Sequence, residues 1–248
     1  MENISLPQTI TAKKIENNHE EITISPCYPG YGTTLGNALR RVLLSSLEGA
    51  AATAVKIKGV DHEFSTLDHV KEDVVDIILN LKKIRFKIHS EEPVEIKLKV
   101  KGEKKITAKD FTKNSQVEIS TPTQVIATTT DPKAEFELTL LAENGRGYIP
   151  VEMREKEKLD LGYIAIDAVY TPIKNVNFKT EHVRVEEMTN YDKLILNIVT
   201  DGSVSPSEGL EQAANILVEQ FSHVMNNIGT TEEKEEEEKP TKKKSEDK

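Results

Sequence analysis

Apolar positions in the first part of the chain predict a strand followed by a helix. Ile22 and Ile24 alternate with polar residues, as in a half-buried strand. Prolines and glycines then predict a loop, followed by a helix that is capped by Thr33 or Thr34 and closed by Gly49. Helical spacing predicts a buried stripe on this helix, formed by Leu35, Ala38, Leu39, Val42, Leu43 and Leu47.

The middle of the chain, from Ala51 to Lys174, is dominated by the alternation that is typical of strands. Four segments show this alternation: Ala54–Lys58, Val94–Val100, Gln124–Thr128 and Phe136–Leu140. One helix interrupts them, and its inner face is expected to consist of Val70, Val74, Ile77, Ile78 and Leu81. Many short strands separated by turns predict a strand-rich subdomain.

The last part again combines a strand with a helix. Leu194, Leu196 and Ile198 alternate with their neighbours, and the segment Ser205–Glu208 is a capping box with proline at the first helical position. The helix that it opens carries apolar residues at alternating spacings of four and three: Leu210, Ala214, Leu217, Phe221, Val224 and Ile228. This seam suits packing against another helix, including one from a second copy, or against the chain's own sheet. Spacing alone leaves both interpretations open.

The charge of the chain argues against direct binding to DNA. The net charge is -9 over 248 residues. The segment from Thr231 to Lys248 holds eight acidic and six basic residues and nothing that could anchor a core, so we expect it to be disordered. The remaining body is therefore clearly acidic. Because affinity for nucleic acid comes mainly from neutralising phosphates, such a body is a poor primary DNA binder.

Composition excludes several classes of protein. The longest apolar runs are far shorter than the roughly 18 residues that would indicate a membrane span. The segment Met1–Ser5 lacks the basic start of a signal peptide. A single cysteine, Cys27, rules out an intrachain disulfide and fits the reducing cytoplasm, and without a histidine partner it indicates an inert residue.

Residues that could carry catalysis are few. His62 and His69 lie close in sequence, but no further Cys or His follows at the spacing of metal ligands. The segment Gly145–Gly147 lacks the rest of a phosphate loop and is better explained as a tight turn in which Arg146 forms an ion pair. No Asp-x-Asp-x-Asp pattern is present that would bind magnesium for nucleotidyl transfer. We therefore expect no catalytic residue, no metal and no cofactor in this chain.

One continuous motif carries a family resemblance. Gly30–Ser46 reads Gly-Tyr-Gly-Thr-Thr-Leu-Gly-Asn-Ala-Leu-Arg-Arg-Val-Leu-Leu-Ser-Ser and closely resembles the signature helix of bacterial RNA polymerase alpha subunits. The resemblance continues, in the family's order and spacing, through His62–Ser65, Val70–Val74, Leu79–Lys82, Gly145–Tyr148, Asp167–Pro172, Val183–Glu186 and Pro206–Phe221. It thus covers nearly the whole body of the chain.

The resemblance implies an α+β fold with a discontinuous dimerisation domain and an inserted strand-rich subdomain. Expected boundaries are residues 1–50 with 175–229 for the first, 51–174 for the insert, and 230–248 for a disordered charged tail. It also implies a homodimer that acts as a non-catalytic scaffold, on which the β and β′ subunits assemble, with omega and sigma completing the enzyme. Contact with DNA would be indirect, because the C-terminal DNA-contacting domain of typical relatives has no counterpart here. We expect this shortness to be natural.

The resemblance and the helical pattern together suggest two sets of interface residues. On the signature helix, Asn37, Arg40, Arg41 and Leu44 lie opposite the apolar stripe and are candidates for binding a large subunit, since arginine pairs are common at interfaces. A solvated basic edge is the alternative. The segment Lys71, Glu72 and Asp73 is a further candidate. The candidates for the dimer interface are Leu35, Leu39, Leu43, Leu210, Ala214, Leu217, Phe221, Val224 and Ile228.

Two rival classes of protein remain. The acidic body and the lack of basic clusters with interleaved aromatic residues disfavour an independent nucleic-acid-binding protein. An archaeal or eukaryotic-type polymerase assembly subunit would work as a heterodimer, and its motifs are looser than the match over Leu35–Arg41. A measurement of whether the purified chain is a homodimer would separate these rival classes from the alpha subunit.

Overall fold

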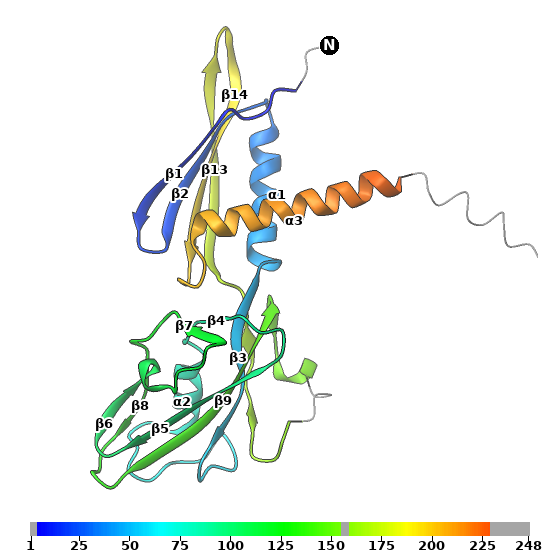
Figure 1. Cartoon of the computed structure of the whole chain (residues 1–248). Coiled ribbons are helices and arrows are strands. Elements are labelled where there is room, and N and C mark those ends of the chain that lie inside the picture. Colours follow the sequence, from blue (N-terminus) through cyan, green and yellow to red (C-terminus); the bar gives the residue numbers. More distant parts are fainter. Residues whose placement is uncertain (1–3, 155–158, 229–248) are drawn as a thin grey trace, which may run out of the picture.

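The computed structural model describes residues 4–154 and 159–228 of the chain. These residues form two bodies that lie end to end (Figure 1). Both ends of the chain contribute to one body, which we call the terminal domain, and the middle of the chain forms the other, which we call the insert domain. The combination of sheets and helices confirms the α+β fold. The charged segment 230–248 lies outside the described residues.

The terminal domain is an antiparallel sheet with two helices on one face (Figure 1). Its strand order is β1-β2-β14-β13, with bounds β1 Thr9–Glu16, β2 His19–Cys27, β13 Ile173–Val185 and β14 Met188–Thr200. The helices are α1 Tyr31–Ser45 and α3 Pro206–Asn227. One apolar cluster joins them, with Ile22 and Ile24 from β2, Leu194, Leu196 and Ile198 from β14, Leu39 and Leu43 from α1, and Ala213 from α3.

Helix α1 begins and ends earlier than the sequence predicts. It starts at Tyr31, and Gly30 occupies the cap position with a φ of 83° and no capping side chain of its own. The prediction of Thr33 or Thr34 as the cap was wrong, because the cap comes from a residue distant in sequence. Gly49 does not close the helix either, since strand β3 (Glu48–Ile57) has already begun and pairs with β9 (Glu135–Arg146).

Two glycines let α1 lie directly on the sheet. A Cβ atom at Gly36 would stand 2.6 Å from Cδ2 of Phe178, and one at Gly32 would stand 2.8 Å from Cβ of Asp192. Both distances are shorter than real contacts between carbon atoms, so each position requires the absence of a side chain. The separation of helix and sheet therefore depends on glycine at these positions.

The insert domain is built on a six-stranded sheet. The order along it is β5-β9-β3-β4-β7, with β11 paired to β3, and β6 pairs with β8 while β10 pairs with β12. The bounds are β3 Glu48–Ile57, β4 Phe86–Ile88, β5 Val94–Lys101, β6 Lys104–Thr107, β7 Val117–Ile119, β8 Val125–Thr129, β9 Glu135–Arg146, β10 Tyr148–Ile149, β11 Ile164–Ala165 and β12 Ala168–Val169. Two short 3-10 helices, η1 Ala108–Asp110 and η2 Val151–Arg154, complete it.

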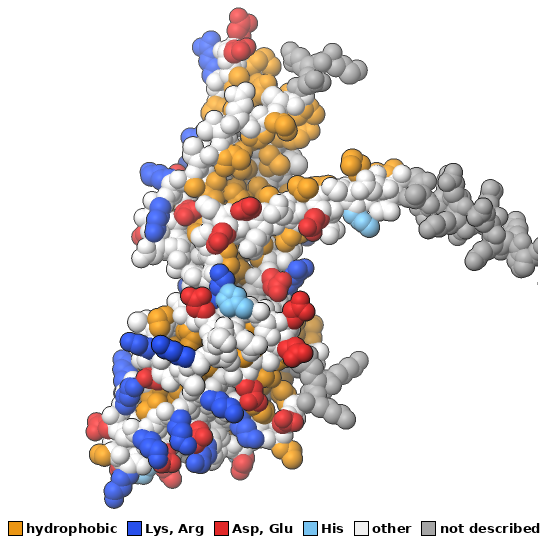
Figure 2. Space-filling model, in the orientation of Figure 1, with side chains coloured by type: hydrophobic (Ala, Val, Ile, Leu, Met, Phe, Trp, Pro, Cys, Tyr) orange, Lys and Arg blue, Asp and Glu red, His pale blue; other side chains and the backbone are white. Residues whose placement is uncertain are grey.

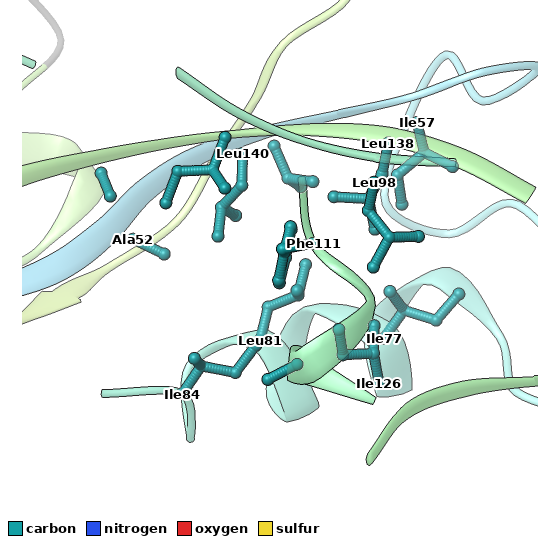
Figure 3. Close-up of a cluster of buried hydrophobic side chains, with 14 of the residues drawn as sticks. Ala52, Ile57, Ile77, Leu81, Ile84, Leu98, Phe111, Ile126, Leu138 and Leu140 are labelled. Atoms are coloured by element: carbon teal, nitrogen blue, oxygen red, sulfur yellow. The ribbon is translucent and has the colours of Figure 1, made fainter. Parts of the chain in front are cut away.

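Helix α2, Val74–Leu81, packs its apolar side chains into one core with those of the strands. Figure 3 shows Ile77 and Leu81 pointing from α2 toward Leu98, Leu138 and Leu140 of the strands. Strand β5 has the strict alternation of buried and exposed residues that its sequence predicts. The prediction that Val70 belongs to the helix was wrong: the side chain of Asp73 caps α2, and Val70 instead forms an isolated bridge with Thr129.

A buried ion pair joins the two domains. Nε of Arg85, which precedes β4, lies 3.4 Å from Oδ2 of Asp201, which follows β14. The same guanidinium donates a hydrogen bond to the carbonyl of Val169 at 3.1 Å. Asp201 also accepts hydrogen bonds from the backbone N–H and the hydroxyl of Ser203. Because both charges are largely buried, their pairing restricts how the domains can rotate against each other.

We predict that Gly36→Ala lowers the free energy of unfolding by about 1 to 3 kcal/mol, because the added methyl group forces Phe178 or α1 to move. Urea denaturation measures this change. Asn37→Ala, on the exposed side of the same helix, is the matched control and should alter stability by less than about 0.5 kcal/mol. Equal losses for the two variants would contradict close packing as the cause.

Candidate assembly surfaces

The second half of helix α3 extends beyond the terminal domain and exposes an apolar surface (Figure 1). Phe221 has 67% of its surface exposed. The other large apolar side chains exposed on this half are Val218, Val224 and Met225, and Ile228 directly after the helix is exposed as well. Figure 2 shows apolar side chains on this helix and over the neighbouring sheet. Such a continuous apolar surface is unusual for a protein that functions as a monomer.

An apolar groove lies beside this helix. It has a volume of about 320 Å³ and runs between the β1-β2 hairpin and the two helices. The apolar residues along it are Ile10, Ala12, Ile22, Ile24, Leu39, Leu210 and Ala214, and the polar ones are Ser207 and Glu211. We call the groove and the exposed half of α3 together the α3 face. It offers both a projecting apolar element and a cavity that could receive one.

The two interpretations of the α3 seam apply to different halves of the helix. Leu210, Ala214 and Leu217 are half-buried against the chain's own sheet and α1, whereas Phe221 and Val224 are exposed. The last member of the seam, Ile228, follows the helix and is also exposed. The capping box at Ser205 is confirmed: its hydroxyl accepts the N–H of Glu208 at 3.2 Å, and the Glu208 carboxylate accepts the N–H of Ser205 at 3.1 Å.

Three of the candidate dimer residues lie on α1, and the structure gives them different positions. Leu43 is fully buried, and Leu39 is nearly so. Both belong to the core of the single chain, so they support the α3 face from below and offer almost no surface to a partner. Leu35 is half-buried at the edge of the same cluster. Helical spacing alone could not predict which of these residues is fully buried, because residues of the core and residues at its edge lie on the same stripe of the helix.

The opposite side of α1 carries the predicted arginine patch. Asn37, Arg40, Arg41 and Leu44 are all exposed there. Neither arginine forms an ion pair with any residue in the described ranges. Two guanidinium groups beside an exposed leucine are therefore free to bind a partner.

Asp192 of β14 supplies the cap that α1 lacks. Its Oδ2 atom accepts hydrogen bonds from the N–H groups of Gly30, at 2.9 Å, and Gly32, at 3.2 Å. The residue is only 5% exposed, and its Oδ1 atom lies 3.4 Å from Nδ1 of His182. A carboxylate at a helix N-terminus also interacts favourably with the helix dipole. The cap was missed because it lies more than 150 residues away in the sequence.

The candidate segment Lys71–Asp73 is mostly engaged within the chain. Glu72 accepts hydrogen bonds from the backbone N–H and the hydroxyl of Thr128, at 2.7 and 2.9 Å. Asp73 accepts the N–H of Asp76 as the cap of α2. Glu72 therefore ties the start of α2 to β8, Asp73 caps the helix, and only the side chain of Lys71 remains exposed without such a bond.

A second apolar surface lies on the insert domain and was not identified as a site from the sequence. Phe64 is 79% exposed beside Leu79, at a groove of about 410 Å³ that Ile78 and Ile166 also line. At its edge, Nζ of Lys82 donates a hydrogen bond to Oδ2 of Asp167 at 3.0 Å, and this bond lowers the pKa of Asp167. Aromatic residues exposed on a surface often anchor protein interfaces.

The residues that the sequence offered for catalysis or metal binding have structural roles. Gly147 connects β9 to β10, and Arg146 lies 3.8 Å from Glu48, as expected for an ion pair at this turn. Cys27 is buried, and burial raises the pKa of its thiol. Within residues 4–154 and 159–228, no three His, Cys, Asp or Glu side chains are grouped as metal ligands would be. In the same ranges, no helix is long and apolar enough to cross a membrane.

These features define a class of protein: a two-domain α+β subunit whose exposed surfaces are suited to assembly with other chains. Residues 55–171 match the family model described as RNA polymerase Rpb3/RpoA insert domain. The chain is 43% identical over 246 residues to the DNA-directed RNA polymerase subunit alpha of Oceanobacillus iheyensis, covering 99% of this chain and 77% of that protein.

Two further relatives bear the same name. The protein from Maridesulfovibrio salexigens is 43% identical over 219 residues, and the one from Alkaliphilus oremlandii is 46% identical over 208. These matches cover 88% and 84% of this chain, but only 63% and 65% of the relatives, which is less than two thirds of their length. The chain belongs to the family of bacterial DNA-directed RNA polymerase alpha subunits. These names do not favour the archaeal or eukaryotic-type alternative.

We predict that Asp192→Ala lowers the free energy of unfolding by about 2 kcal/mol, since two backbone N–H groups lose a charged acceptor. Asp192→Asn should cost less, because its amide oxygen can still accept a hydrogen bond. Chemical denaturation measures both changes. His182→Ala is the control and should cost less than about 0.5 kcal/mol. Equal losses for His182→Ala and Asp192→Ala would place the stabilisation in the ion pair and not in the helix cap.

Proposed function

We propose that this chain is a non-catalytic scaffold that forms a homodimer and nucleates the assembly of a bacterial DNA-directed RNA polymerase. The observation that carries the proposal is the α3 face, which presents an exposed apolar helix beside an apolar groove. Family membership supports the same role, since all three relatives are named as polymerase alpha subunits. Polymerisation itself would belong to the large subunits.

In the proposed dimer, the exposed half of α3 from each copy lies in the groove of the other. Helix and groove are parts of the same surface, so a two-fold axis would satisfy both contacts at once. Helix α3 has 22 residues and is therefore about 33 Å long. Its projecting half, roughly half of that length, would lie along the groove of the neighbouring copy. An interface of this kind would be apolar and obligate.

The arginine patch on α1 would then bind a large subunit, β on one copy and β′ on the other. Because the two copies are identical, each presents the same arginine patch and the same groove beside Phe64. The two large subunits would therefore differ in which of these surfaces each of them contacts. Omega and sigma would join the complete enzyme, and the acidic body would meet DNA only through the other chains.

We predict that Phe221→Glu converts the dimer to a monomer at micromolar concentration. A buried, unpaired carboxylate costs about 3 kcal/mol or more. This corresponds to an increase in the dimer Kd of roughly a hundredfold. Sedimentation equilibrium of the purified chain measures the change.

Gln220→Glu is the matched control for the dimer experiment. It adds the same charge one residue earlier, at an exposed polar position of α3. This variant should remain dimeric. A wild-type chain that sediments as a monomer at micromolar concentration would contradict the proposed dimer.

We predict that Arg41→Ala, and to a lesser degree Arg40→Ala, leaves the fold and the dimer intact but weakens capture of the β subunit. Loss of an arginine at an interface hot spot costs about 2 kcal/mol or more of binding free energy. Co-purification with tagged β subunit, followed by titration, measures the effect. Arg184→Ala removes an exposed arginine of β13 and should bind as the wild type does. Normal binding by both α1 variants would identify the patch as a solvated edge.

A further inference from the structure

The six-stranded sheet of the insert domain is not closed, and its two end strands lie on either side of a groove. Strand β5 stands at one end of the strand order and β7 at the other. A groove of about 340 Å³ is nevertheless lined by Ile96 of β5 and by Val117, Glu118 and Ile119 of β7. The curvature of the sheet therefore brings its first and last edges to one opening. An open strand edge is a template for pairing with another chain. The edge of β5 is already paired at Lys97 and Leu98, so the edge of β7 is the candidate for such pairing.

The floor of this groove is apolar and firmly held. Ile96 and Phe111 are buried, and Val117 and Ile119 are half-buried along its sides. Figure 3 shows Phe111 among the core side chains, near Leu98. Phe111 also forms an isolated bridge with Leu98, and the neighbouring Thr112 N–H donates to the carbonyl of Lys97 at 2.8 Å. The floor is thus part of the domain core and offers a fixed apolar contact.

The backbone of β7 has a free side at Ile119. The N–H of Ser120 donates to the carbonyl of Arg85, and the N–H of His89 donates to the carbonyl of Gln116, both at 2.9 Å. In an antiparallel pair, alternate residues face the neighbouring strand, so the N–H and carbonyl of Ile119 point away from β4. No residue of the described ranges hydrogen-bonds to Ile119 on that side.

Positive charge surrounds the opening in an otherwise acidic chain. The segment from Val94 to Ile119 holds seven lysines and four acidic residues, whereas the whole chain has a net charge of -9. Four of these lysines pair with carboxylates, and Lys109 and Lys113 are the lysines that line the groove. Figure 2 shows Lys and Arg side chains gathered on this part of the insert domain. Lys109 and Lys113 line the groove, are exposed and form no ion pair within the described residues. Glu118 is the one acidic residue on its lining, and it lies opposite Lys87 in the strand register.

We propose that this groove binds an extended, acidic peptide segment of a partner protein. The segment adds a strand to β7 at Ile119, its aliphatic side chain rests on Ile96 and Phe111, and its carboxylates lie near Lys109 and Lys113. Strand addition of this kind takes affinity from backbone hydrogen bonds and specificity from side-chain contacts. An apolar floor without exposed aromatic rings for stacking bases favours a peptide over single-stranded nucleic acid. This surface is separate from the α3 face and from the arginine patch.

The test uses the full chain and a fluorescent peptide with a Val-Ile-Val centre and two Asp residues on each flank. Fluorescence anisotropy near physiological salt, where exposed charges are screened beyond about 8 Å, should show saturable binding. Three comparison probes are a peptide with Lys flanks, a peptide of Asp alone and a DNA duplex, and all should bind more weakly. Equal or tighter binding of the Asp peptide or the DNA would overturn the proposal, because charge alone would then explain the contact.

Paired charge variants locate the site. Lys109→Glu with Lys113→Glu should weaken peptide binding by about tenfold or more, since two favourable contacts become repulsive. Lys105→Glu with Lys133→Glu makes the same change in net charge at exposed lysines outside the groove, and it should alter binding by less than about twofold. Equal losses for the two pairs would overturn the assignment.

Hydrogen exchange distinguishes strand addition from a loose association. The amide of Ile119 should exchange more slowly when the peptide is bound, while thermal unfolding shows that each variant remains folded. Peptide binding without protection at Ile119 would overturn the strand-addition geometry. Deletion of residues 229–248 should leave the affinity unchanged. A gain in affinity on deletion would instead make the chain's own acidic segment the occupant.

Discussion

The terminal domain depends on how closely α1 approaches its sheet. Gly32 and Gly36 remove the side chains that would hold the helix away, so Phe178 and Asp192 lie directly beneath it. The same approach brings the Asp192 carboxylate within hydrogen-bond distance of the helix N-terminus. A single packing constraint therefore sets both the depth and the start of α1. It also decides which residues face outward, since Arg40 and Arg41 are exposed only because the opposite side is fixed in the core.

Local patterns in the sequence predicted most elements correctly, because those elements are specified by their own residues. The alternation of β5 and the capping box at Ser205 are two such cases. The wrong predictions concern places where a residue distant in the sequence provides a hydrogen bond or a strand pairing. Asp192 caps α1, and pairing with β9 ends the helical segment before Gly49. No rule that reads only neighbouring residues can detect such partners.

The candidate site residues show the same difference between what local spacing specifies and what distant contacts specify. The exposure of Asn37, Arg40, Arg41 and Leu44 follows from helical spacing, and the structure agrees with it. Spacing could not tell that Leu39 and Leu43 serve the core while Phe221 and Val224 are exposed, because this difference depends on where α3 leaves the sheet. The groove between β5 and β7 was also invisible, since it arises from the curvature of a whole sheet and no motif marks it.

The division of α3 into a packed half and a projecting half has a consequence for the life of the chain in a cell. The single chain exposes Phe221, Val224 and Met225 to water, together with the groove beside them. Surfaces of this kind promote aggregation and are recognised by chaperones and proteases, which remove unassembled or partly open chains. In the proposed dimer this surface would be covered. Unassembled subunits would thus be removed because their apolar surface is exposed. The amount of the subunit in the cell would then match the amount of complete enzyme.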